Sequence, residues 1–135
     1  MNKVTNKYFY DTGQFDVLID AVLNEPKKVG NIVSSNRSIT WAMNTVGENV
    51  LHYLAVENHI EGVELLRSVG SPISPWALTH ALQAGHTDMV ILLLELGADP
   101  IVSSCKSALE SDLWKLDKNT KRLMRSYFKQ YGHEV

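Results

Sequence analysis

The sequence has little cysteine and little excess charge of either sign. Cys105 is the only cysteine among 135 residues, so an intrachain disulfide is excluded and a reducing compartment fits the chain. Thirteen Lys and Arg against fifteen Asp and Glu leave a net charge of −2. This balance provides no general electrostatic attraction to nucleic acid or to an anionic membrane.

Long hydrophobic runs are also missing. The longest, Met89 to Leu94, is far too short to span a bilayer, and the stretch from Met1 to Tyr8 lacks the apolar run of a signal peptide. We therefore expect a cytoplasmic protein that binds neither membrane nor nucleic acid.

Helical periodicity dominates what is present. Apolar residues recur with the spacing of one helix face at Phe15, Leu18, Ile19, Val22 and Leu23. Pro26 ends this helix and can begin the next, which runs through residues 29–33. Residues 40–42 could form a short strand, but no partner strand of similar quality is found. An all-α fold is predicted.

Two stretches of the sequence repeat each other at one offset. The matching residues are separated by 27 positions without a gap, and they are Leu51 and Leu78, His59 and His86, Val63 and Val90, and Gly70 and Gly97. Such self-similarity is typical of a helical repeat protein.

The second stretch resembles an ankyrin repeat through Ala81, Gly85-His86, Val90, Leu92-Leu93-Leu94 and Gly97-Ala98-Asp99. The first shares Gly47, Leu51-His52, Ala55, His59, Val63, Leu65-Leu66 and Gly70. Ankyrin units are about 33 residues long, so one connection is short. The sequence from Ser71 to Pro75 replaces the usual finger, with Ser74 as the expected N-cap and Pro75 at the first helical position.

The resemblance implies one domain over residues 1–135, an ankyrin-like helical repeat solenoid of about four helix pairs. Its expected parts are an N-terminal capping unit (14–43), a repeat (44–73), a shortened repeat (74–100) and a C-terminal capping unit (101–132). Leu65, Leu66, Leu92 and Leu93 should fill the space between helix layers, and Gly70 and Gly97 should end helices with a left-handed backbone.

No residue set in the sequence has the spacing of a catalytic or metal site. The matched positions of His59 and His86 favour a structural hydrogen-bonding role, and His52 coincides with the family's own structural histidine. No ligand spacing for zinc exists, so we expect no metal and no cofactor. Cys105 lacks a plausible base. The enzyme alternative, a small hydrolase using His80 and Asp88, is the weakest hypothesis.

Two features have competing interpretations. The basic residues from Lys115 to Lys129 form either the solvated polar face of the last helix or, less favoured, a nucleic-acid patch. Trp41 is either a contact anchor in an exposed finger loop or folds back onto the shortened loop, and Trp76 either covers the gap or faces a partner. Trp114 is expected in the core, on a helical stripe with Leu109, Leu113 and Leu116.

The resemblance implies a non-catalytic module, monomeric when free, that binds another protein through its concave face and finger loops. A scaffold or adaptor role and an immunity protein that neutralises a cognate toxin or effector are both forms of this function. The expected contact residues are Trp41, Met43, Thr45, Val46, Glu48, Val56, Glu57, Trp76, Gln83 and Ala84.

Overall fold

The computed structural model describes residues 7–135. Contacts within the chain divide it into two compact units, which are described separately below. The first unit comprises residues up to Tyr53 together with Glu61–Pro72, and the second comprises Leu54–Ile60 and Ile73–Val135. Eight α-helices and two strands of two residues each make up the regular structure of the described residues, apart from two 3-10 turns, so the fold is all-α.

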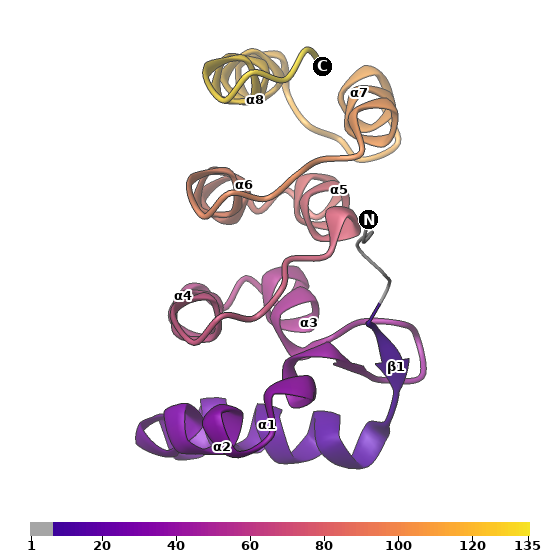
Figure 1. Ribbon diagram of the computed structural model, residues 1–135. Coiled ribbons are helices and arrows are strands. Elements are labelled where there is room, and N and C mark those ends of the chain that lie inside the picture. The colour runs from indigo at the N-terminus through magenta and orange to yellow at the C-terminus, as the bar shows by residue number, and fades with distance from the viewer. Residues whose placement is uncertain (1–6) are drawn as a thin grey trace, which may run out of the picture. The chain divides into compact units, whose positions relative to one another are not determined.

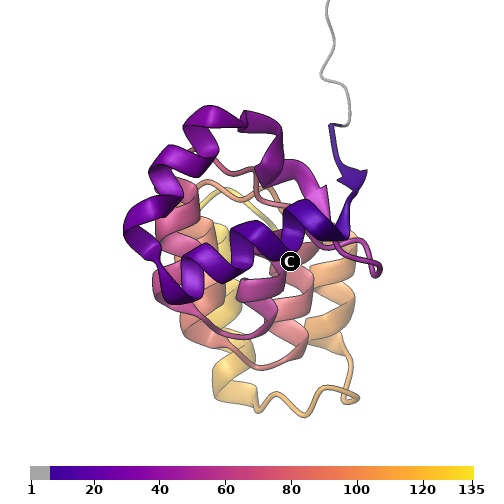
Figure 2. The same cartoon turned by 90° about the horizontal axis from the view of Figure 1, so that it is seen from below.

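The first unit begins with a capped helix and a helical hairpin. Its elements are β1 (Phe9–Tyr10), α1 (Thr12–Asn24), η1 (Pro26–Lys28), α2 (Val29–Ser35), η2 (Arg37–Trp41) and β2 (Ala42–Met43). The Asp11 carboxylate caps α1 by accepting a hydrogen bond from the Gln14 backbone N–H. Pro26 occupies the first position of η1, as the sequence predicts. Figure 2 shows α1 in indigo and α2 in purple, joined through η1.

The two strands correct one expectation from the sequence. β1 pairs in parallel with β2, with Phe9 opposite Ala42 and Tyr10 opposite Met43. The segment 40–42 was expected to have no partner strand. It has one 33 residues away, and two residues of β-structure are too short to produce a periodicity signal. The pairing fixes β1 beside the start of the following loop.

The repeat offset of 27 residues reappears in the backbone hydrogen bonds. The repeats are built from α3 (Val50–Val56), α4 (Ile60–Ser68), α5 (Pro75–Gln83) and α6 (Thr87–Glu95). After α3 and α5, the backbone N–H groups of His59 and His86 donate to the carbonyls five residues back. After α4 and α6, the Ser71 and Ala98 N–H groups do the same. Each turn is a Schellman motif, which satisfies carbonyls left free at the helix end.

The glycines at these helix ends have the predicted backbone. Gly70 and Gly97 both have φ of 90°, and each N–H donates to the carbonyl three residues back. Ser74 caps α5, with its hydroxyl accepting from the Trp76 N–H and Pro75 at the first helical position. Both predictions from the sequence are confirmed.

In the second unit, α5 packs against α6 and α7 (Val102–Glu110), while α6 packs against α8 (Lys118–Gln130) (Figure 1). Leu78, Met89, Leu93, Leu109 and Phe128 are among its fully buried side chains. Ala81 is also fully buried, as expected where helices approach closely. The predicted leucine layer needs one correction, because Leu92 is half-buried while Leu93 is inaccessible.

Trp114 is not in the core. Helix α7 ends at Glu110, and Leu113 and Trp114 lie exposed in the turn that precedes α8. Lys115 has a φ of 59°, which no helical stripe allows. The expected stripe failed because its apolar spacing continues across this loop. Among the described residues, no helix has both the length and the apolarity to cross a membrane.

Candidate functional site

The finger loop, defined here as Met43–Asn49, is held by its own polar groups. The Asn44 side-chain oxygen accepts hydrogen bonds from the Val46 and Glu48 backbone N–H groups, at 3.1 and 3.0 Å. The Asn44 N–H donates to the Glu48 carbonyl at 2.9 Å, and Met43 and Asn49 form an antiparallel bridge. Gly47, with φ of 83°, allows the tight turn between them. The loop is therefore preorganised.

Aromatic side chains gather beside this loop. The Tyr8 and Trp41 rings meet edge to face, with centroids 4.6 Å apart. Strand alternation places Trp41 and Met43 on one face, while Ala42 between them is completely buried on the other. Tyr10 is paired with Met43, and its hydroxyl lies 3.8 Å from where a Cβ on Gly47 would be. Trp41, Tyr8, Tyr10 and the loop tip therefore adjoin one another.

The finger surface, as the term is used below, consists of Tyr8, Tyr10, Trp41 and Val46. Tyr10 and Val46 are 71% and 74% exposed, whereas Tyr8 and Trp41 are half-buried against each other. Burial raises the pKa of the Tyr8 hydroxyl, so this group stays neutral at physiological pH. A groove of about 330 Å³ beside Trp41 is lined in part by Lys7 and Arg37, which give it a basic rim.

The tyrosines were missed by reasoning from the sequence. Tyr8-Phe9-Tyr10 is a short aromatic run, which favours a strand. Only the pairing with β2 shows that it lies beside the finger loop. Trp41 matches neither of its two expected alternatives fully, because it packs on Tyr8 and remains partly accessible.

Glu48 faces inward more than the other expected contact residues of the loop. Its side chain is 17% exposed, accepts from the Asn44 amide at 3.3 Å and lies 3.9 Å from His52 Nε2. Neighbouring Asn49 donates to the Thr40 carbonyl and accepts from the His52 backbone N–H. Glu48 and Asn49 thus support the loop. Thr45 is exposed and Met43 is half-buried.

In the second unit, Trp76 lies on an accessible face of α5. Its ring is 47% exposed and stacks with the His80 ring at a centroid distance of 6.0 Å. Gln83 and Ala84 follow at the spacing of the same helix face, half-buried and exposed respectively. We call Trp76, His80, Gln83 and Ala84 the α5 face.

The end of α3 holds the remaining expected contact residues. Glu57 is exposed and Val56 is half-buried. The Val56 carbonyl lies 2.9 Å from His86 Nε2, and because a carbonyl only accepts, this nitrogen donates. The structural role expected for His86 is thereby explained. The ten expected contact residues divide equally between the two units.

The groups considered for chemistry are placed for packing. Cys105 is completely buried, 3.6 Å from the Thr79 hydroxyl, and burial raises the pKa of its thiol despite that hydrogen bond. His80 stacks on Trp76, and Asp88 is exposed in the first turn of α6. These environments favour an inert thiol and a histidine that takes part in a surface.

Comparison with protein families identifies one part of the chain. Residues 76–104, from Trp76 through α5 and α6 into α7, match the Ankyrin repeat family. No curated protein and no solved structure matched the chain. The match covers the unit in which the 27-residue hydrogen-bond pattern ends with Gly97 and Ala98. The chain is thus an ankyrin-repeat protein, with the family match at residues 76–104.

Proposed function

We propose that the chain binds a partner protein through the finger surface. Ankyrin repeats generally mediate binding to other proteins. The observation that carries the proposal is the position of exposed Tyr10 and Val46 beside Trp41, on a loop fixed by Asn44. Tyr and Trp are the side chains that most often dominate binding energy in protein interfaces.

Preorganisation supports the same conclusion. A loop held by its own hydrogen bonds loses little conformational freedom when it binds, so more of the contact energy appears as affinity. Aromatic rings add a large contact area at low rotamer entropy cost. The basic rim formed by Lys7 and Arg37 favours a partner that places an acidic group beside an apolar one.

The α5 face is a second contact surface in this proposal. Trp76 is the largest accessible side chain on it, and its stack with His80 fixes the indole ring. Binding is favoured over the hydrolase alternative for this face, because the His80 ring is held against an indole. An immunity function would be a special case in which the partner is a toxin.

Site-specific photocrosslinking tests the finger surface. A photoreactive phenylalanine analogue is placed at Val46, and at exposed Glu64 on α4 as the matched control. We expect a partner crosslinked from Val46 and not from Glu64. A partner crosslinked from Glu64 and not from Val46 would contradict the proposal. Adding the purified partner's activity assay, where it is a toxin, tests the immunity alternative through inhibition.

A further inference from the structure

Helix α8 carries an unbroken basic stripe on its exposed side. Lys118, Arg122, Arg125 and Lys129 are exposed and follow one another at spacings of four, three and four residues, which is one face of a helix. The helix contains no acidic residue. The stripe spans about 16 Å at the rise of an α-helix.

The stripe is not neutralised within the chain. Among the described residues, the ion pairs of the protein do not include these four side chains, and Arg122 donates to the neutral Asn119 side chain. Residues 101–135 hold seven Lys and Arg against four Asp and Glu, while residues 1–100 hold six against eleven. The chain is therefore strongly polarised despite its small net charge.

Helix α1 has the opposite character. Asp16 and Asp20 lie exposed in the middle of its outer face, and the helix contains no Lys or Arg. Asp20 accepts from the Asn24 amide, and neither carboxylate is in an ion pair among the described residues. Val17, between them in sequence, is 55% exposed.

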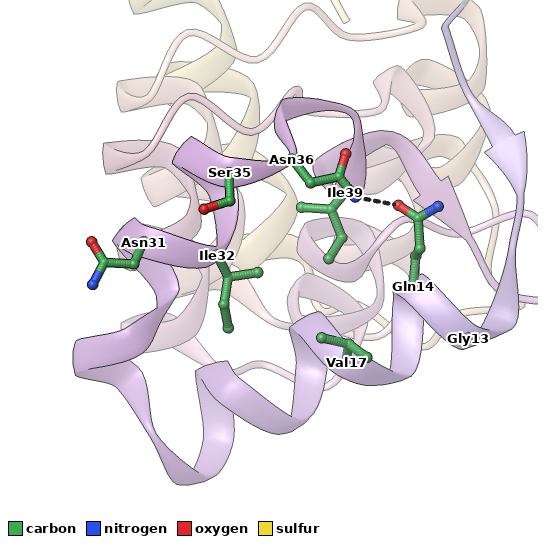
Figure 3. Close-up of a pocket in the computed structure, with 8 residues that line it drawn as sticks. All are labelled: Gly13, Gln14, Val17, Asn31, Ile32, Ser35, Asn36 and Ile39. Carbon is green, nitrogen blue, oxygen red and sulfur yellow. Dashed lines mark hydrogen bonds between the residues drawn. The ribbon is translucent and has the colours of Figure 1, made fainter.

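Val17 also borders a groove of about 490 Å³ between α1, α2 and η2. Figure 3 shows Ile32 on α2 and Val17 on α1 at this groove, with Ile39 from η2 behind them. Its polar edge is fixed, because the Asn36 amide donates to the Gln14 side chain at 2.9 Å and Gln14 donates to Asp11. The groove is apolar inside, neutral at its edge and adjacent to the acidic face.

We propose that a second copy of this chain docks its α8 against the α1 groove. Its basic stripe would face Asp16 and Asp20, and its Leu123, which is 48% exposed, would enter the groove beside Val17. Leu123 adjoins Arg122 as Val17 adjoins Asp16, so apolar and charged contacts form together. Both helices have 13 residues, about 20 Å, and match in length.

Other occupants fit the basic stripe less well. Met124 and Phe128, the large apolar residues of α8, are completely buried, so they are not accessible to a lipid surface. A nucleic acid would meet the acidic excess of residues 1–100. The acidic counterpart that the structure itself provides is α1. Because the two surfaces differ, the contact is heterologous and can add further copies in solution. This replaces the monomer expected from the sequence.

Sedimentation equilibrium of the full chain tests the proposal. The mean mass of the wild type should rise with concentration up to about 1 mM protein in about 0.05 M salt, and fall back in about 0.5 M salt because charge pairs are screened. Arg122→Glu/Arg125→Glu reverses the α8 stripe, and Asp16→Lys/Asp20→Lys reverses α1. All four positions are exposed, so both variants should fold, which circular dichroism checks.

Each variant alone should associate at least tenfold more weakly than the wild type, while an equimolar mixture of the two should associate again. The control Glu61→Lys/Glu64→Lys on α4 makes the same change in net charge as the α1 variant and should behave as the wild type. A wild type that stays at monomer mass throughout would overturn the proposal. So would a mixture that does not associate, or a control that weakens association as much as the α1 variant.

Discussion

Leu92 and Leu93 are adjacent in sequence but differ in burial. Leu93 is inaccessible within the second unit, whereas Leu92 is half-buried. Leu93→Ala should therefore lower the free energy of unfolding by about 2–5 kcal/mol, because the lost side chain leaves a cavity. Leu92→Ala should cost distinctly less. Urea denaturation of both variants measures the difference, and an equal cost would contradict the assigned packing of α6.

Cys105 links burial to the pH dependence of stability. Burial raises the pKa of its thiol above the ordinary value of 9.0, so the folded protein keeps a proton that the unfolded chain releases. This contribution to stability is complete below the unfolded pKa and is lost as pH rises through the folded pKa. The free energy of unfolding should thus fall more steeply for the wild type than for Cys105→Ala between about pH 7.5 and about pH 10.

The comparison with Cys105→Ala is needed because other groups also titrate in this range. Tyr8, whose pKa is raised as well, is present in both proteins and cancels in the difference. Urea denaturation at each pH gives the two curves. Parallel curves would show that the thiol has the same pKa in the folded and unfolded chain.

At the scale of elements, helix ends were the part of the fold most predictable from sequence. Gly70 and Gly97 mark them because a left-handed residue is needed where a Schellman motif closes. The information is local, lying within six residues. β1 and the turn at Trp114 could not be predicted in this way. The first depends on a pairing across 33 residues, and the second on an apolar spacing that continues past the end of α7.

Two glycines separate backbone conformation from packing. Gly30 in α2 and Gly70 after α4 both have open space where a Cβ would stand, but only Gly70 has a positive φ. Gly70→Ala should destabilise the protein by about 1–2 kcal/mol, the cost of a left-handed alanine. Gly30→Ala should stabilise it by about 0.5–1 kcal/mol, because alanine is the better helix former. Thermal unfolding of the pair measures both signs, and a shared sign would contradict the helix boundary at Gly70.

At the scale of the whole molecule, the sequence predicted the kind of surface better than its members. Trp41, Val46 and Trp76 are accessible as expected, but the expected list included Glu48, whose carboxylate supports the loop from inside. Tyr10 was absent from the list although it is one of the most exposed aromatic residues. Side-chain exposure depends on which elements pack together, and this information is spread over the whole chain.

The hot-spot prediction follows from these positions and is tested with the partner once identified. Trp41→Ala should weaken binding by at least about 2 kcal/mol, and Val46→Ala should weaken it with little change in melting temperature because its side chain is exposed. Glu48→Arg should weaken binding to a similar extent as Trp41→Ala, but it should also lower the melting temperature, since it breaks the contacts with Asn44 and His52.

Calorimetry and melting curves on the same variants separate these effects. Glu64→Lys on the exposed side of α4 is the control and should leave the affinity nearly unchanged. Trp76→Ala tests the α5 face independently, because this residue belongs to the other unit. If Glu64→Lys weakens binding while Trp41→Ala changes stability alone, the finger surface is not the binding site. If Trp76→Ala weakens binding and both finger variants leave it intact, the partner is held by the α5 face, and the aromatic cluster at Trp41 serves only to attach β1 to the first unit.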